Sequence, residues 1–335
     1  MGDMINKAPL LAVIGCLVVG FVLLIKGADF FVEGSSNVAK KLKVPSIIIG
    51  LTIVAMGTSL PETAVSVTAS IAHNNELAIS NVVGSNIFNL MFVIGVCSML
   101  APIFVHKDTI RRDIPLSILC AVVLLACGIA GIGDTFGMTL GHLDGILFLI
   151  LFAGYIGLML KSALSARSQE QKEEWKEYEE AEEELELLSL PKSLLFIVGG
   201  AIAIAIGGDL TVDSASRIAI DLGMTQTLVG LTIVSIGTSL PELVTSIVAA
   251  RKNEVDMAVG NAVGSNIFNI LMVLGIASSI SPMAIIRENV IDILVLIGFS
   301  FVVWVFAATK RKISAKEGIV MVLLYLVYAV YIVMR

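Results

Sequence analysis

Residues 50–66 read GLTIVAMGTSLPETAVS, an apolar stretch that nevertheless contains a proline and a glutamate side by side. The pattern returns at residues 230–246 as GLTIVSIGTSLPELVTS, with the same pair of residues. A proline interrupts a membrane helix, and a carboxylate in lipid costs on the order of 3 kcal/mol, so neither is expected there without a reason. The repetition indicates a function for the two pairs, Pro61–Glu62 and Pro241–Glu242.

The composition of the whole chain is that of a membrane protein. Of its 335 residues, 57% are hydrophobic and 15% are charged, and the mean hydropathy is +0.95; a soluble chain of this length needs more polar surface. The apolar segments are about 18–25 residues long, enough to cross a hydrocarbon core of about 30 Å as helices. We therefore expect an all-α polytopic membrane protein with about ten transmembrane helices. The expected spans are residues 8–39, 45–72, 76–101, 113–131, 142–163, 192–220, 226–250, 256–281, 289–308 and 315–334.

An internal duplication organises the chain. Residues 50–102 align with 230–282 without a gap, and GADFFVEGSSNVA at Gly27 aligns with GGDLTVDSASRIA at Gly207. Each half then holds five expected spans, and because five is odd, the second half enters the membrane from the opposite side. The prediction is two inverted five-helix repeats. The predicted units are residues 1–165, the acidic linker 166–191 and residues 192–335.

Basic residues gather on one side of this layout. They follow the first, third, seventh and ninth spans and flank the linker, whereas the other side carries few. By the positive-inside rule we expect a multi-pass protein of the cell membrane with a solvated cytoplasmic linker and both termini outside. Outside the linker, the basic residues on the predicted cytoplasmic side are Lys40, Lys41, Lys43, Lys107, Arg111, Arg112, Arg251, Lys252, Lys310, Arg311, Lys312 and Lys316.

Each proline is expected to release backbone oxygens beside its glutamate. Proline has no N–H and clashes with the carbonyl four residues earlier, which belongs to Gly57 or, in the second copy, to Gly237. Carbonyls released in lipid must line a cavity or bind an ion, and carbonyl, hydroxyl and carboxylate oxygens together suit a hard cation. The alternative is that the glutamates only cap broken helices. The segments concerned are Ala55–Thr58 and Ser235–Thr238, with the hydroxyls of Thr58, Ser59, Thr238 and Ser239.

A second repeated motif adds neutral oxygen ligands. It reads NVVGSNIFN at residues 81–89 and NAVGSNIFN at 261–269. Its serine and its last asparagine are four residues apart and so share one helix face. Interhelical hydrogen bonding would also explain them, but beside two glutamates we favour ion binding. The residues are Ser85 and Asn89 in the first copy, and Ser265 and Asn269 in the second.

The charge of this site limits which ions it can bind. Two carboxylates without a nearby lysine or arginine give a net charge of −2, which one Ca²⁺ neutralises and which two or three Na⁺ could also occupy. No Cys, His or Met lies in the repeated motifs, so soft metals are disfavoured. Inverted repeats around a site at the membrane midplane are typical of alternating-access transporters. The four cysteines, Cys16, Cys97, Cys120 and Cys127, are interpreted as small core residues.

The motifs resemble those of a known family. GTSLPE followed by GSNIFN in both halves is similar to the α-repeats of the sodium/calcium exchangers, prokaryotic type, in the cation/calcium exchanger superfamily. The resemblance implies ten helices with an ion core formed by the second, third, seventh and eighth. It also implies a secondary antiporter that carries Ca²⁺ and Na⁺ and extrudes Ca²⁺. We expect no organic cofactor, no nucleic-acid partner, no enzymatic activity and function as a monomer in the bilayer.

The resemblance also gives each residue of the motifs a role. It implies that the carboxylates of Glu62 and Glu242 bind both ions, and that the backbone carbonyls of Thr58 and Thr238 bind Ca²⁺. It implies that Na⁺ is bound by the hydroxyls of Ser59, Ser85, Ser239 and Ser265 and by the carbonyls of Ala55 and Ser235. It also implies that Asn89 and Asn269 border the central site.

The chain departs from the family pattern at one position. Well-known members carry an aspartate where this chain has Asn269. The amide resembles a protonated carboxyl in shape and in lacking charge, so transport is compatible with it. The ratio of Na⁺ to Ca²⁺ and any sensitivity to protons are not carried over from the family.

Three other functions remain as alternatives. The nearest is a Ca²⁺ or other divalent-cation/H⁺ antiporter that uses the same glutamates. A cation channel fits inverted repeats with discrete sites poorly, and an intramembrane enzyme lacks any visible protease or zinc motif. Four acids in the first and sixth spans either belong to a gating pair of helices, as the family suggests, or are polar helix ends at the interface. They are Asp29, Glu33, Asp209 and Asp213.

Overall fold

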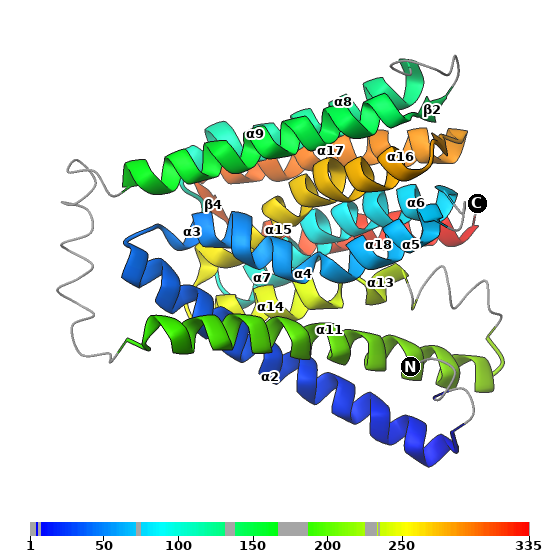
Figure 1. Cartoon of the computed structure of the whole chain (residues 1–335), viewed down its shortest axis with the longest axis horizontal. Helices are drawn as coiled ribbons and strands as arrows, with labels where there is room; N and C mark the ends of the chain where they lie inside the picture. Colours follow the sequence, from blue (N-terminus) through cyan, green and yellow to red (C-terminus); the bar gives the residue numbers. More distant parts are fainter. Residues whose placement is uncertain are drawn as a thin grey trace.

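The computed structural model describes residues 8–71, 75–130, 138–166, 187–224 and 235–334, together with residues 5 and 233. Almost all of these residues are helical, and the long helices lie side by side along the longest axis of the molecule (Figure 1). The predicted all-α fold is confirmed.

The first half contains long helices, short π-helical turns (labelled η) and two short strands. In chain order they are α2 (Leu10–Leu42), α3 (Ser46–Ile49), η1 (Gly50–Val54), α4 (Ala55–Thr58), α5 (Leu60–Ile71), α6 (Asn75–Ile87), η2 (Phe88–Val93), α7 (Ile94–Leu100), β1 (Ile103–Phe104), η3 (Thr109–Asp113), α8 (Ile114–Ala130), β2 (Thr139–Leu140) and α9 (His142–Ala166).

The described part of the second half follows the same order, except that no π-helical turn precedes α17. Its elements are α11 (Leu190–Asp221), α13 (Ser235–Gly237), α14 (Leu240–Arg251), α15 (Val255–Phe268), η6 (Asn269–Leu274), α16 (Gly275–Ile280), β3 (Met283–Ala284), α17 (Arg287–Lys310), β4 (Lys312–Ile313) and α18 (Ala315–Met334).

The described residues contain eight helices that are long and apolar enough to cross a membrane. The bent pair Ser46–Thr58 and Leu60–Ile71 gives a ninth span. The expected span at 226–250 lies partly outside the described residues, so the count of ten stays a prediction; α13 and α14 are its described parts. Most of the linker expected at 166–191 also lies outside the described residues.

Two long helices, α2 and α11, lie together along one side of the bundle (Figure 1). Glycines let their backbones approach closely. A Cβ atom added at Gly27 would lie 2.9 Å from the backbone N of Ile204, and one added at Gly207 would lie 2.7 Å from the backbone N of Leu24. Small residues at crossing points are how membrane helices pack without a hydrophobic driving force. The helices α2 and α11 are therefore closely packed, and they occupy matching places in the two repeats.

Two broken helical rods form the centre of the protein. In Leu77–Leu100 and in Val255–Ile280, 78% of the most apolar window is buried, compared with 22% in Leu10–Leu42 and 17% in Ala315–Met334. Each central rod is interrupted by a π-helical turn at matching places, η2 and η6. Such turns inside helices are frequent at functional sites.

Two small antiparallel sheets join the halves crosswise. β1 of the first half pairs with β4 of the second, with Ile103 opposite Ile313. β3 of the second half pairs with β2 of the first, with Met283 opposite Leu140. The sequence did not predict these pairs, because two-residue strands between helices carry no periodicity.

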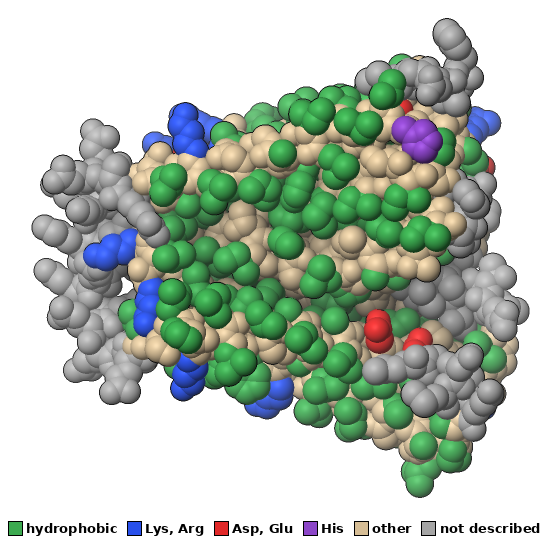
Figure 2. Space-filling view, viewed as in Figure 1, with side chains coloured by type: hydrophobic (Ala, Val, Ile, Leu, Met, Phe, Trp, Pro, Cys, Tyr) green, Lys and Arg blue, Asp and Glu red, His purple; other side chains and the backbone are tan. Residues whose placement is uncertain are grey.

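The surface is apolar along its length and basic at one end. Figure 2 shows hydrophobic side chains covering the visible face, with most of the visible Lys and Arg side chains at one end of the bundle. At this end α9 stops and α11 begins, whereas α2 begins and α18 stops at the opposite end (Figure 1). The predicted separation of basic residues from the chain termini is therefore present in three dimensions.

Candidate cation site between the inverted repeats

Glu62 and Glu242 occupy matching places in the two repeats. Each lies in the first turn of its helix, α5 or α14, directly after a proline, and each is 0% exposed. Proline is tolerated in the first turn of a helix, and the N–H groups there stabilise a carboxylate. A buried pair of like charges favours a bound cation.

The predicted helix break lies at Ser59, two residues before Pro61. The helices on either side of Ser59 are bent by 48°. The carbonyl of Ala55 was expected to lose its helical partner, but it accepts a hydrogen bond of 3.0 Å from the Ser59 N–H. That expectation is wrong because the break begins only after this bond; the second lone pair of the oxygen is still available. In the second copy the Ser239 N–H donates instead to Ile236 O at 3.1 Å.

Serine hydroxyls connect each glutamate to the opposite repeat. Ser59 donates a hydrogen bond of 3.1 Å to Glu242 Oε1, and Ser239 donates one of 3.3 Å to Glu62 Oε1. Ser239 also lies 2.9 Å from the hydroxyl oxygen of Ser85. The structure thus brings residues of both motifs and both repeats into one cluster.

The threonines of the two motifs bind asparagines that the sequence analysis did not single out. Thr58 Oγ1 donates to Asn261 Oδ1 at 3.0 Å, and Thr238 Oγ1 donates to Asn81 Oδ1 at 3.2 Å. Ser265 lies 3.4 Å from Thr58 Oγ1. Both asparagines begin the second repeated motif, and their i, i+4 spacing to its serine was the signal that could have identified them.

A pair of asparagines marks the symmetry axis between the repeats. Asn86 Nδ2 donates to Asn266 O at 3.2 Å, and Asn266 Nδ2 donates to Asn86 O at 3.1 Å. This reciprocal pair is what an approximate two-fold axis requires. Asn269 Nδ2 donates to Asn86 Oδ1 at 3.1 Å, which connects the axis to the candidate site.

Several oxygens of the site are buried and have no hydrogen-bond partner among the described residues. They include one carboxylate oxygen of each glutamate, Glu62 Oε2 and Glu242 Oε2. The amide oxygens of Asn89 and Asn269 are also unpartnered, as is Asn89 Nδ2. A buried oxygen without a partner costs about 1–3 kcal/mol, so such groups require an explanation. A bound cation supplies one, because it satisfies oxygens of both charged and neutral groups.

The side chain of Ser235 lies outside the described residues; its backbone begins α13. The carbonyl role that the resemblance gives to Thr58 and Thr238 stays a prediction. Asn89 is fully buried, but it makes no hydrogen bond to the described residues with its side chain.

The inverted-repeat fold with paired carboxylates buried between the repeats defines a secondary transporter. The sequence profile of the family described as sodium/calcium exchanger protein matches residues 12–161 and 192–334. The chain belongs to this sodium/calcium exchanger family, whose members are transporters and not enzymes.

Individual relatives are similar to this chain over most of its length. The sodium/calcium exchanger MaX1 of Methanosarcina acetivorans is 35% identical over 94% of this chain and 96% of its own length. The putative antiporter CaxA of Alkalimonas amylolytica is 40% identical over 79% of this chain and 80% of its own. A solved structure of the sodium-calcium exchanger NCX_Mj superposes with a TM-score of 0.81 at 31% identity, covering 95% of this chain and 98% of its own.

Proposed function

We propose that this chain exchanges Na⁺ for Ca²⁺ across the membrane by alternating access and extrudes Ca²⁺. The observation that supports this most is the pair of fully buried carboxylates, Glu62 and Glu242, each with one unpartnered oxygen and each bound by a serine of the opposite repeat. One Ca²⁺ balances the charge of −2, and Na⁺ ions can replace it among the same oxygens.

We propose the same ligands that the resemblance implies. The carboxylates of Glu62 and Glu242 serve both ions in turn. The carbonyls of Thr58 and Thr238 bind Ca²⁺. The proposed Na⁺ ligands are the hydroxyls of Ser59, Ser85, Ser239 and Ser265 and the carbonyls of Ala55 and Ser235, and Asn89 and Asn269 border the central site.

The relatives favour Na⁺ over H⁺ as the coupling ion. MaX1 is named a sodium/calcium exchanger, and structures of NCX_Mj were obtained after soaking with Na⁺ together with Ca²⁺ or Sr²⁺. If three Na⁺ cross for one Ca²⁺, one net charge moves per cycle, which corresponds to about 2.3 kcal/mol per 100 mV. A negative interior then favours Ca²⁺ extrusion.

The proposed orientation places the basic end of the bundle in the cytoplasm. It follows from the positive-inside rule and from the Lys and Arg side chains at that end (Figure 2). Both termini are then outside, residues 1–165 and 192–335 act as the two halves, and the linker is cytoplasmic. We further propose a monomer in the cell membrane, since one chain contains both repeats of the site.

Ion flux into proteoliposomes tests the proposal. An outward Na⁺ gradient should drive ⁴⁵Ca²⁺ uptake when the pH gradient is collapsed, and a K⁺ gradient should not. If a pH gradient drives uptake and a Na⁺ gradient does not, the chain is a divalent-cation/H⁺ antiporter. Flux that neither saturates nor requires a counter-ion would indicate a channel.

Glutamine substitutions test the site itself. E62Q and E242Q should each lower Na⁺-driven Ca²⁺ uptake more than about tenfold, since each removes half of the charge that balances Ca²⁺. E288Q is the matched control, because Glu288 is exposed at the start of α17. Substantial uptake by both site variants, in protein that folds and reconstitutes normally, would exclude this site.

A further inference from the structure

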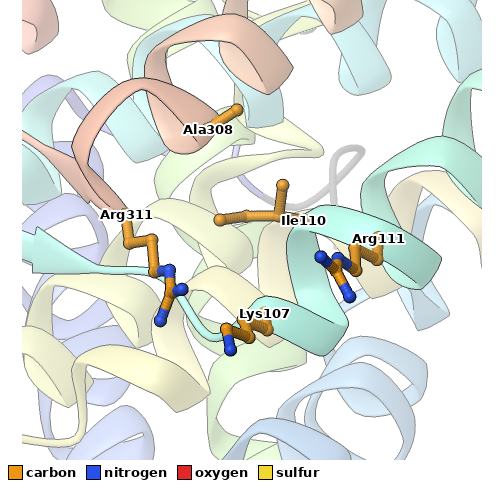
Figure 3. Close-up of a pocket in the computed structure, with 5 residues that line it drawn as sticks. All are labelled: Lys107, Ile110, Arg111, Ala308 and Arg311. Atoms are coloured by element: carbon orange, nitrogen blue, oxygen red, sulfur yellow. The ribbon is translucent and has the colours of Figure 1, made fainter.

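An open pocket of about 180 Å³ lies at the basic end of the bundle, away from the candidate cation site. It is lined by Lys107, Ile110, Arg111, Ala308 and Arg311. Figure 3 shows Arg311, Lys107 and Arg111 arranged around Ile110, with Ala308 above them. The pocket thus lies between the end of α17 and the segment that leads into α8, and its lining is both cationic and apolar.

The backbone around the pocket is fixed by contacts between the two halves. Arg311 follows α17 in the left-handed conformation, with φ of 50°. Its carbonyl accepts a hydrogen bond of 2.8 Å from the Val105 N–H, next to the β1–β4 pair. On the other side, Trp304 Nε1 donates to Ile110 O at 2.8 Å. The cationic side chains therefore extend from a backbone that is held in place.

The charges of the pocket are not neutralised within the described part of the chain. None of the ion pairs there includes Lys107, Arg111 or Arg311. No acidic residue lines the pocket either. Three cations held around one small pocket repel one another, and an anion bound between them would relieve that repulsion.

The inverted repeat provides an internal comparison at the opposite end of the bundle. There the Ile285 N–H donates to Met138 O at 2.7 Å, next to the β2–β3 pair, in the same arrangement. Met138 thus takes the place of Arg311, and in the aligned repeat Ile291 takes the place of Arg111. Only Lys107 keeps a cationic counterpart, Arg287. The shared backbone arrangement therefore does not require three cations, and they belong to this end alone.

An exposed apolar strip on α17 leads to the pocket. Phe301 is 46% exposed and Val305 is 51% exposed, and Ala308 follows at the spacing of one helix face. Trp304 lies on the same stretch, edge-to-face against Phe301. Tryptophan is typical of the membrane–water interface. A ligand with a phosphate group and an acyl chain matches both parts of this surface.

We propose that this pocket binds the phosphate group of an anionic phospholipid of the leaflet that the basic end faces. The three cations contact the headgroup, and an acyl chain lies along Phe301 and Val305. Basic pockets between membrane helices are suited to such headgroups. The lipid would connect α17 with the segment before α8. The same phosphate chemistry could come from free phosphate, and the experiment separates the two sources.

Fluorescence of Trp304 can report the binding. The chain has two tryptophans, so W175F leaves Trp304 alone. In this background, lipids with brominated chains should quench Trp304, and brominated phosphatidylglycerol should be about tenfold more effective than brominated phosphatidylcholine at equal mole fraction. The triple variant K107Q/R111Q/R311Q should lose this preference.

Two matched variants control for net charge and for folding. K161Q/K310Q/K316Q removes three exposed cations at the same end without touching the pocket lining, and it should keep the preference. K107R/R111K/R311K keeps the charges and should also keep it. Equal loss in the pocket triple and in the charge control, or no preference in the parent protein, would overturn the proposal. Millimolar inorganic phosphate at constant ionic strength should not remove the preference; if it does, free phosphate is the ligand and the lipid assignment is wrong.

Discussion

Ser59 of the first repeat donates a hydrogen bond of 3.1 Å to Glu242 of the second. The reciprocal bond, from Ser239 to Glu62, is 3.3 Å long. Each glutamate is therefore oriented by a hydroxyl from the other repeat. Neither repeat contains all residues of the candidate site, and any relative movement of the repeats changes the hydrogen bonds of both carboxylates together.

The two serines should affect Na⁺ more than Ca²⁺. In S59A and S239A the carboxylate loses a hydrogen bond to a charged group, worth about 1.5–3 kcal/mol, and a proposed Na⁺ ligand is removed. We expect the Na⁺ concentration for half-maximal exchange to rise about tenfold, and the Ca²⁺ concentration to change less. S300A removes a buried hydroxyl that bonds within its own helix, to Leu296 O, and should leave both unchanged. Equal effects on both ions would contradict the assignment of these hydroxyls to Na⁺.

Replacing Asn269 by aspartate should change how ion exchange depends on pH. Its amide donates to Asn86 Oδ1, and its own oxygen is unpartnered. In N269D the introduced carboxyl can donate the same bond only when protonated, and burial favours that neutral form. We therefore expect exchange by N269D to approach that of the parent protein at acidic pH and to diverge as pH rises. Flux measured across a pH series should reveal this slope, and identical pH profiles would contradict it.

Close contact between the repeats should make any side chain larger than that of glycine destabilising at position 260. A Cβ atom at this position would lie 2.6 Å from Ile47 O, which is backbone and cannot move aside easily. We expect G260A to cost about 1–3 kcal/mol and to lower the thermal midpoint in detergent by several degrees. Gly157, whose Cβ would meet nothing within 4 Å, provides the control, and G157A should be neutral or slightly stabilising. Equal midpoints for the two variants would show that the contact is looser than described.

Lys252 should hold α2 against the end of α14. Its Nζ lies 3.6 Å from both Asp29 Oδ1 and Glu33 Oε2 and donates to Asp29 O at 3.0 Å. Ser36 also donates a hydrogen bond to Glu254 in the same region. Two of the four acids that the sequence left open, Asp29 and Glu33, thus pair with another helix end; their part in gating remains a prediction.

Hydrogen exchange can measure this contact. K252Q should accelerate amide exchange in the segment that follows α14 and in the facing part of α2. Lys26 supplies a matched control, because it pairs with the same Asp29 at 3.7 Å but within its own helix. K26Q should therefore leave the exchange of the 252–256 segment unchanged. If amide hydrogen exchange in the 252–256 segment is the same in both variants, Lys252 does not hold the helices together.

Much of the fold was predictable because it follows from local pattern. The observed helices begin and end within a few residues of the expected spans, since lipid imposes a fixed length of apolar sequence. The repeat predicted that Glu62 and Glu242 occupy matching places. The break at Pro61 was predicted, but the sequence misplaced its start, and Ala55 O keeps its partner.

Contacts between distant segments could not be predicted in the same way. Nothing local indicates that Ser59 reaches Glu242 or that Asn86 pairs with Asn266, because these bonds depend on how the repeats are rotated against each other. The roles of Asn81 and Asn261 had a weak local signal, their spacing to a serine. Even so, their threonine partners belong to the opposite repeat.

The two crosswise sheets bear on how this chain could be assembled. In β1–β4 and β2–β3, each half completes a strand pair only with the other. The interface therefore has the geometry of an antiparallel dimer whose subunits have been fused. Two separately expressed polypeptides, cut within the linker, would still carry every complementary surface, and their reassembly into a functional carrier would need no covalent connection.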